Sequence, residues 1–86
     1  MPKIHLILLE TSACHLCEQA FAIVTQCQAD NIDLLIEHID IAEFPEWQPK
    51  YATRIPVLYH PETQQDLDWP FDQTNVTTFI EALRHD

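Results

Sequence analysis

Two cysteines, Cys14 and Cys17, have the residue type and the spacing best suited to chemistry in this chain. A cysteine thiolate is a nucleophile, and two cysteines about one helical turn apart can form a disulfide and release it again. A strand-like apolar run precedes the pair and a helical pattern follows it, which predicts that the pair lies at the start of a helix. Unpaired amide groups and the helix dipole stabilise a thiolate there. The pattern therefore predicts thiol–disulfide exchange in which Cys14 is the exposed, attacking thiol and Cys17 is the resolving thiol.

The same spacing also occurs in metal sites, so a metal-binding pair and an inert pair stay open beside the redox interpretation. A structural zinc ion takes four ligands, usually from two such cysteine pairs, and this chain has only one further cysteine, Cys27. Cys27 falls on the apolar side of the predicted helix, where we expect a small core residue. His15 lies inside the pair rather than after it, which excludes the haem-attachment motif. We expect no metal and no bound prosthetic group, with the Cys14–Cys17 disulfide as the electron carrier.

Charged residues near the pair act on the thiolate in opposite directions. Protonated His15 would favour a thiolate at Cys14, whereas Glu18 and the acidic character of the chain oppose it. The sign of the net effect stays open at this stage. Our hypothesis is that Arg54, next to Ile55, supplies the positive charge that the site otherwise lacks. His15 and Arg54 are therefore candidate substrate-binding residues beside the two cysteines.

Composition excludes several other classes of function. The 86 residues carry a formal net charge of −10 and contain no glycine. Phosphate-binding loops of the G-x-G-x-x-G and P-loop kinds need glycine, so nucleotide binding through such a loop is excluded. The few cations cannot form the basic stripe that nucleic acid needs, and anionic membrane surfaces would repel the chain. We expect neither nucleic acid nor a membrane as a partner. Because the first residues lack the pattern of a signal peptide, we expect a cytoplasmic location.

Apolar patterning predicts a single α/β domain over residues 1–86. The expected strands are 4–9, 34–41, 57–59 and a short one near Leu67, and the expected helices are one ending at about residue 29, a short or irregular one at 44–51, and a closing one after Asp72. The first helix should bury Cys17, Ala20, Phe21, Val24 and Cys27, and the last one Val76, Phe79, Ile80 and Leu83. Asp72 is a suitable N-cap, and the strand–helix–strand start predicts a parallel crossover.

The cysteine pair at a helix start, followed after a second strand by Ile55-Pro56-Val57, resembles the thioredoxin fold in its short, glutaredoxin-like form. Residues 40–46 and 50–58 are similar to stretches of small bacterial glutaredoxin-like proteins, and residues 14–17 and 68–72 to a short Cys-His-Leu-Cys branch of them. The resemblance implies a thioredoxin-like βαβ-α-ββα fold, with a four-stranded mixed sheet in the order 2-1-3-4 flanked by helices. It also implies a cis Pro56 against the cysteine pair, and an Ile55 backbone that is free to pair with an extended substrate or with glutathione.

Two positions depart from the glutathione-using members of that family. Those members usually carry a Gly-Gly pair before the last helix, where the backbone approaches the tripeptide, whereas residues 66–72 here contain Trp69 and Pro70 and no glycine. They also tend to carry basic residues near the first cysteine, where positions 12 and 13 here are uncharged. The redox fold therefore carries over, while these departures argue against glutathione as the partner.

The leading interpretation is a glutaredoxin-like thiol–disulfide oxidoreductase that reduces or exchanges disulfides through Cys14 and Cys17. Its expected partners are a disulfide-containing protein or a small thiol, together with a reductase that the sequence does not identify. The first alternative is a non-catalytic interaction module that keeps the fold and binds a protein through its acidic face or the region of Trp69. A metal-binding protein is the second alternative.

Overall fold

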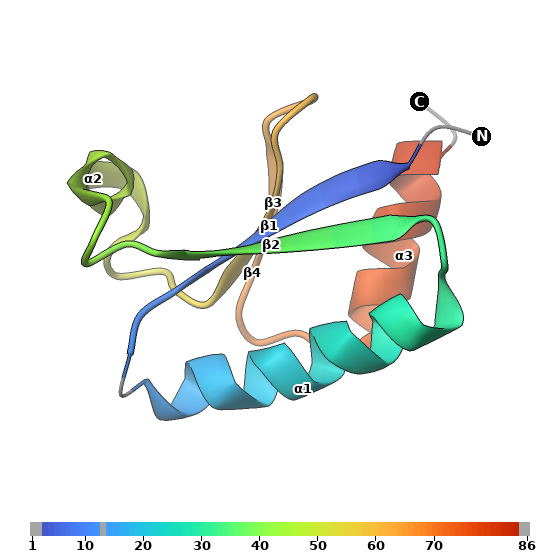
Figure 1. Cartoon of the computed structure of the whole chain (residues 1–86), viewed down its shortest axis with the longest axis horizontal. Coiled ribbons are helices and arrows are strands. Elements are labelled where there is room, and N and C mark those ends of the chain that lie inside the picture. Colours follow the sequence, from blue (N-terminus) through green and yellow to red (C-terminus); the bar gives the residue numbers. More distant parts are fainter. Residues whose placement is uncertain (1–2, 13, 85–86) are drawn as a thin grey trace.

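The structure is a computed structural model and describes residues 3–12 and 14–84. Its elements follow one another as strand, helix, strand, two short helices, two strands and a closing helix (Figure 1). In chain order they are β1 (Ile4–Glu10), α1 (His15–Asp30), β2 (Leu34–Asp40), the 3-10 helix η1 (Pro45–Trp47), α2 (Gln48–Tyr51), β3 (Val57–His60), β4 (Gln65–Asp68) and α3 (Gln73–Arg84). This is the predicted order of elements.

The four strands form one mixed sheet in the order β2-β1-β3-β4. β1 and β2 are parallel, from the pair Ile4 and Leu34 to the pair Glu10 and Asp40. β3 runs antiparallel to both β1 and β4. A parallel pair needs a long connection across the sheet, and α1 provides it. The predicted α/β class and the strand order implied by the resemblance are confirmed.

The side chains of β1 alternate between two hydrophobic cores, because successive residues of a strand point to opposite faces. Leu6 and Leu8 pack on the face that α1 and α3 cover, whereas Ile7 and Leu9 pack on the face of η1 and α2. Figure 1 shows α1 and α3 together on one side of the sheet, with α2 apart from both. Because β1 is covered on both faces where these four residues lie, its sequence is an unbroken apolar run rather than an alternating one.

One face of α1 packs against the sheet through Cys17, Ala20, Val24 and Cys27, all buried as predicted. Phe21 was predicted to be buried on this face, and this is wrong, since its side chain is 47% exposed. It lies at the flank of the apolar stripe, toward the edge strand β2, and its ring contacts His38 of that strand with 5.1 Å between centroids. Beyond an edge strand there is no further sheet to cover a flanking side chain.

α3 begins with a reciprocal pair of hydrogen bonds. The amide of Asn75 donates to Oδ1 of Asp72 at 2.8 Å, and the amide of Asp72 donates to Oδ1 of Asn75 at 2.9 Å. This confirms Asp72 as the capping residue, since both bonds satisfy amide groups that the helix start leaves unpaired. The predicted inner face is confirmed too, with Val76 and Ile80 buried and Phe79 and Leu83 packed against the same core.

The segment between β2 and β3 is irregular because prolines interrupt it. Pro45 and Pro49 divide it into the short helices η1 and α2, as expected from the missing amide donors. Trp47 packs here against Tyr59, with ring centroids 5.3 Å apart, and against Tyr51 at 6.0 Å. Within the described residues, no helix has the length and apolar character needed to cross a membrane.

Candidate active site

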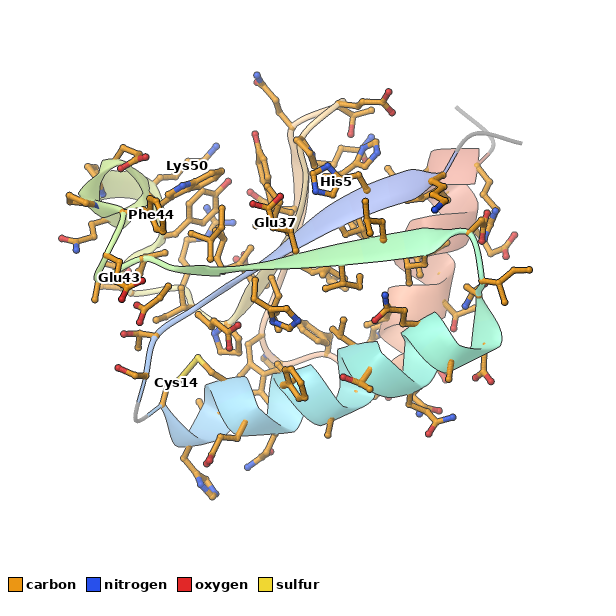
Figure 2. The ribbon with its side chains drawn as sticks, in the orientation of Figure 1. His5, Cys14, Glu37, Glu43, Phe44 and Lys50 are labelled. Carbon is orange, nitrogen blue, oxygen red and sulfur yellow. A yellow bond between two sulfur atoms is a disulfide. The ribbon has the colours of Figure 1, made fainter. Side chains whose placement is uncertain are left out.

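Cys14 is the N-cap of α1, and this position determines what surrounds its sulfur. Its backbone is extended, with φ −97° and ψ 110°, and its Sγ accepts a hydrogen bond from the amide of Cys17 at 3.2 Å. The two cysteines lie at disulfide distance, with their Cα atoms 5.2 Å apart. Figure 2 shows the bond between the two sulfurs at the start of α1. The sulfur thus lies at the helix terminus where amide groups and the dipole stabilise negative charge.

The two cysteines differ in exposure. Cys14 is half-buried, whereas the side chain of Cys17, one turn into α1, is buried at 2% exposure. An external disulfide can therefore reach Cys14 and not Cys17. The difference in exposure agrees with the sequence analysis, and the roles of Cys14 as the attacking thiol and Cys17 as the resolving thiol stay a prediction.

An open cavity of about 400 Å³ lies beside the pair. It is lined by Glu10, Thr11, Ser12, Cys14, Cys17, Glu18 and Phe21. A second cavity of about 330 Å³ shares the first three of these residues and continues to His38, Asp40, Glu43 and Phe44. Figure 2 shows Glu43 and Phe44 in the segment after β2, on the side of the molecule where Cys14 lies. The surface next to the cysteines is therefore acidic and partly aromatic, and none of the residues that line either cavity is lysine or arginine.

His15, predicted to be a substrate-binding residue, lines neither cavity. Its side chain is 84% exposed, and its Nδ1 lies 3.6 Å from Oε2 of Glu18, which is itself 79% exposed. A charge on His15 is thus partly offset by Glu18 and strongly screened by solvent.

Arg54 was predicted to supply the positive charge of the site, and the structure places it elsewhere. Its guanidinium forms ion pairs with Asp68 at 2.6 Å and with Asp66 at 3.0 Å, and it stacks 4.8 Å above the ring of Tyr51. The hydrogen bond to Asp68 raises the pKa of Arg54. Arg54 lines neither cavity, and two carboxylates offset its charge. It therefore connects α2 to β4 instead of neutralising the acidic surface beside the cysteines.

The peptide bond between Ile55 and Pro56 is cis, as the resemblance implied, and a second cis bond precedes Pro70. The Ile55 backbone was expected to be free for a substrate, and this is wrong for its amide, which donates to the carbonyl of Tyr51 at 3.1 Å. The turn that ends α2 uses this amide. Pro56 is fully buried, and its carbonyl accepts the amide of Trp69 at 3.2 Å. Neither Ile55 nor Pro56 lines either cavity.

Two residues that the sequence did not single out, Glu10 and His38, lie at the cysteine cavity or next to it. Nδ1 of His38 is 2.8 Å from Oε1 of Glu10, and Glu10 lines both cavities. They stand 28 positions apart in the chain and meet because β1 and β2 pair in parallel with Leu8 opposite His38. Only the strand register could have indicated this contact.

The third cysteine, Cys27, is 3% exposed within the core. Burial raises the pKa of its thiol, and the nearby Asp30 raises it further. A buried thiol with a raised pKa is a poor nucleophile, so Cys27 is the small core residue that the sequence predicted. In residues 3–12 and 14–84 no group of three or more His, Cys, Asp or Glu side chains is arranged to hold a metal ion.

Comparison with known proteins agrees with this fold. The model of the family described as Glutaredoxin-like domain (DUF836) matches residues 5–81. The X-ray structure of target protein XcR50 from X. campestris is similar to this chain at 31% identity and a TM-score of 0.76, covering 90% of this chain and 96% of that one. Protein Ne2328 from Nitrosomonas europaea shares the fold at 22% identity, with a TM-score of 0.75 over 92% of this chain and 93% of its own. No curated protein matches the sequence. The chain therefore belongs to the glutaredoxin-like family.

Proposed function

We propose that this protein is a thiol–disulfide oxidoreductase that uses the Cys14–Cys17 pair to reduce or exchange disulfides. One observation carries the proposal: a reachable cysteine caps a helix beside an open cavity and lies at disulfide distance from a second, buried cysteine. The same arrangement would have no evident use in a protein that only binds a partner.

The reaction follows from the exposure of the two sulfurs. The thiolate of Cys14 attacks one sulfur of a substrate disulfide, and the other substrate sulfur leaves as a thiolate. Cys17 then attacks Cys14, which forms the Cys14–Cys17 disulfide and releases the second substrate thiol. The substrate disulfide gains two electrons, which the cysteine pair loses. An external dithiol or two monothiols return the pair to its reduced form.

The start of α1 assists the first attack. The amide of Cys17 already points to the sulfur of Cys14, and such a hydrogen bond becomes stronger when its acceptor carries a full charge. The first turns of α1 also contribute the positive end of the helix dipole. The carboxylates of Glu10 and Glu18 act in the opposite direction, because they line the same cavity.

The acidic surface argues for a substrate other than glutathione. Glutathione is anionic at neutral pH, and the carboxylates around the cavity repel it. The segment where glutathione-using glutaredoxins usually have Gly-Gly here contains Trp69, whose ring packs on Phe71 at 5.1 Å. We therefore propose a disulfide-containing protein or a cationic small disulfide as substrate, in a reducing compartment such as the cytoplasm.

A coupled assay that offers a glutathione system and a thioredoxin system separately as reductant tests the proposal. We expect turnover with the wild type, none with Cys14→Ser, and a trapped mixed disulfide with Cys17→Ser. The variant Cys27→Ser is the matched control and should keep full activity, because Cys27 lies in the core. Disulfide reduction that survives in Cys14→Ser would overturn the proposal. A wild type that reduces neither small nor protein disulfides would favour the non-catalytic interaction module instead.

A further inference from the structure

Glu10 and His38 form a hydrogen-bonded pair next to the two cysteines. Nδ1 of His38 and Oε1 of Glu10 are 2.8 Å apart, and the side chain of Glu10 is only 22% exposed. Glu10 is the one carboxylate common to both cavities, so it faces the cysteines in the first and His38 in the second. A carboxylate has no proton to donate, so His38 is the donor of this bond while Glu10 is ionised.

In the second attack of the exchange, in which Cys17 attacks Cys14, a base beside Cys17 can assist. The thiol of Cys17 is 2% exposed, and a buried thiol ionises poorly because burial disfavours the thiolate. It must nevertheless lose its proton before it can attack Cys14. A carboxylate that lines the same cavity can accept that proton directly or through a water molecule, for which the cavity has ample room.

We propose that the Glu10–His38 pair accepts the proton of Cys17 during resolution of the mixed disulfide, with Glu10 as the proton acceptor and His38 as a positioning residue. This inference rests on the proposed oxidoreductase function. The S–H bond of Cys17 breaks and its proton passes to the carboxylate of Glu10. The sulfur of Cys17 bonds to that of Cys14 while the bond from Cys14 to the substrate sulfur breaks. The substrate thiolate leaves with the electron pair and takes a proton from solvent.

His38 holds Glu10 in place. Its Nδ1 lies 2.8 Å from Oε1 of Glu10, and this hydrogen bond keeps the carboxylate at the cavity wall. The ring of Phe21 packs on that of His38 at 5.1 Å and holds the imidazole from the side of α1.

Among the described residues, the other charged side chains that line the two cavities are acidic. Glu18 of α1 lines the first cavity with Glu10, and Asp40 and Glu43 line the second with His38. Removing a carboxylate from such a surface should, by charge alone, favour a thiolate and speed both attacks. Removing a base has the opposite effect, because it slows the step in which that base accepts the proton. The two explanations therefore predict opposite signs for the variant Glu10→Gln.

The chain contains a matched control on the other face of the same two strands. His5 of β1 and Glu37 of β2 also pair across the strands, with Nε2 and Oε1 3.0 Å apart. Figure 2 shows both side chains on the upper side of the sheet, whereas Cys14 lies below it. Neither lines a cavity beside the cysteines. Variants of this pair remove the same chemical groups from β1 and β2 at a distance from the reaction.

Stopped-flow absorbance of the reduced full chain with excess dithiodipyridine separates the two attacks. This uncharged aromatic disulfide releases one thiopyridone when Cys14 attacks it and a second when Cys17 resolves the mixed disulfide. We expect Glu10→Gln to slow the second release at least about tenfold near neutral pH, and to leave the first release equal or slightly faster. Above about pH 9, where hydroxide deprotonates the thiol, the variant should approach the wild type.

The remaining variants complete the test. His38→Gln keeps a hydrogen-bond donor for Glu10 but places it on a different side chain, so it should move the pH midpoint of the second release and slow that release less than Glu10→Gln does. Glu37→Gln and His5→Gln should change neither release by more than about twofold. Glu10→Asp provides a second, conservative variant should Glu10→Gln unfold, and is expected to slow only the second release because its shorter side chain displaces the carboxylate.

Two outcomes would overturn the inference. In the first, Glu10→Gln leaves the second release unchanged or accelerates it. In the second, Glu10→Gln slows the second release by the same factor at every pH. Either result leaves the proposed oxidoreductase intact as long as the wild type releases both equivalents. A wild type that never gives the second release would instead remove the proposed function itself.

Discussion

The sulfur of Cys14 accepts a hydrogen bond from the backbone amide of Cys17 at 3.2 Å, so the residue proposed to react first is bound to the backbone of the residue proposed to react second. The bond exists because Cys14 is the N-cap of α1 and its side chain takes the place that serine or aspartate often fills. The helix thereby brings the two sulfurs together and stabilises negative charge on the first. The carboxylates at the cavity oppose that stabilisation.

Removing one of those carboxylates should make reduced Cys14 more reactive. Glu18 lines the cysteine cavity but is 79% exposed, so solvent screens much of its charge. We expect Glu18→Gln to speed alkylation of Cys14 by iodoacetamide about twofold near neutral pH, measured by peptide mapping. Glu46→Gln makes the same charge change in η1, outside both cavities, and should have no effect. An unchanged rate in Glu18→Gln would mean that this carboxylate does not influence the thiolate.

Arg54 should matter for stability and not for the thiol. Its guanidinium is bound by Asp66 and Asp68 and stacks on Tyr51, which connects α2 to β4. We expect Arg54→Ala to lower the free energy of unfolding by about 1 kcal/mol in urea denaturation, because an ion-pair network and a cation–π contact are lost. The alkylation pH profile of Cys14 should stay unchanged.

Lys50→Ala is the control for this variant, since its ammonium also lies near the Tyr51 ring, at 5.5 Å, and should affect stability less. A shifted alkylation profile in Arg54→Ala alone would restore the hypothesis that Arg54 supplies positive charge to the site.

Tyr51 should make the protein sensitive to alkali. Burial first, and then its hydrogen bond to Asp66, raise the pKa of Tyr51 to about 12. In the unfolded chain the phenol ionises at about pH 10, so the folded protein holds a proton that the unfolded chain releases. The stability that this adds is present below about pH 10 and is lost as the pH rises toward about 12.

Urea denaturation at a series of pH values tests this. Over that alkaline window the wild type should lose stability more steeply than Tyr51→Phe, which has no phenol to ionise. Near neutral pH, Tyr51→Phe should be about 1 kcal/mol less stable, because the hydrogen bond to Asp66 is lost. Tyr59→Phe, in the same aromatic cluster, controls for loss of a phenol. Parallel pH slopes for the wild type and Tyr51→Phe would contradict the prediction.

The turn between β3 and β4 should gain from a glycine. Gln64 has a φ of 62°, in the left-handed region where a Cβ atom is crowded, and the chain has no glycine to place there. We expect Gln64→Gly to raise the free energy of unfolding by about 0.5 kcal/mol, after the extra entropy of glycine in the unfolded chain is set against the relieved strain. Gln64→Ala keeps the Cβ atom and should give no such gain. An equal gain in both variants would point to loss of the Gln64 side chain rather than relief of strain.

Much of the fold was predictable because its signals are local. The apolar run of β1, the three- and four-residue steps of α1 and α3, and the cap at Asp72 each depend on neighbours along the chain. The cysteine pair at a helix start depends on the same short-range patterns. The order of the strands and the cis bond before Pro56 came only from the resemblance to a family, since no local pattern specifies either.

The placement of side chains between elements was not predictable in this way. Phe21 and Arg54 were each assigned from their neighbours in sequence, and their partners, His38 and the two aspartates of β4, are distant in the chain. Glu10 likewise gave no signal, because a carboxylate at a strand end is ordinarily solvated. Its meeting with His38 needs the parallel register of β1 and β2, which the packing of α1 and α3 on the whole sheet decides.

The sequence by itself thus determined the fold class, the position of the two cysteines at the start of α1 and which of them is the more exposed, because those features follow from local periodicity and capping. Only the tertiary structure decided which charges surround the sulfurs. It placed two carboxylates at the cavity and paired Arg54 with two aspartates of β4, because strand register and helix packing, rather than spacing along the chain, bring distant charged groups together.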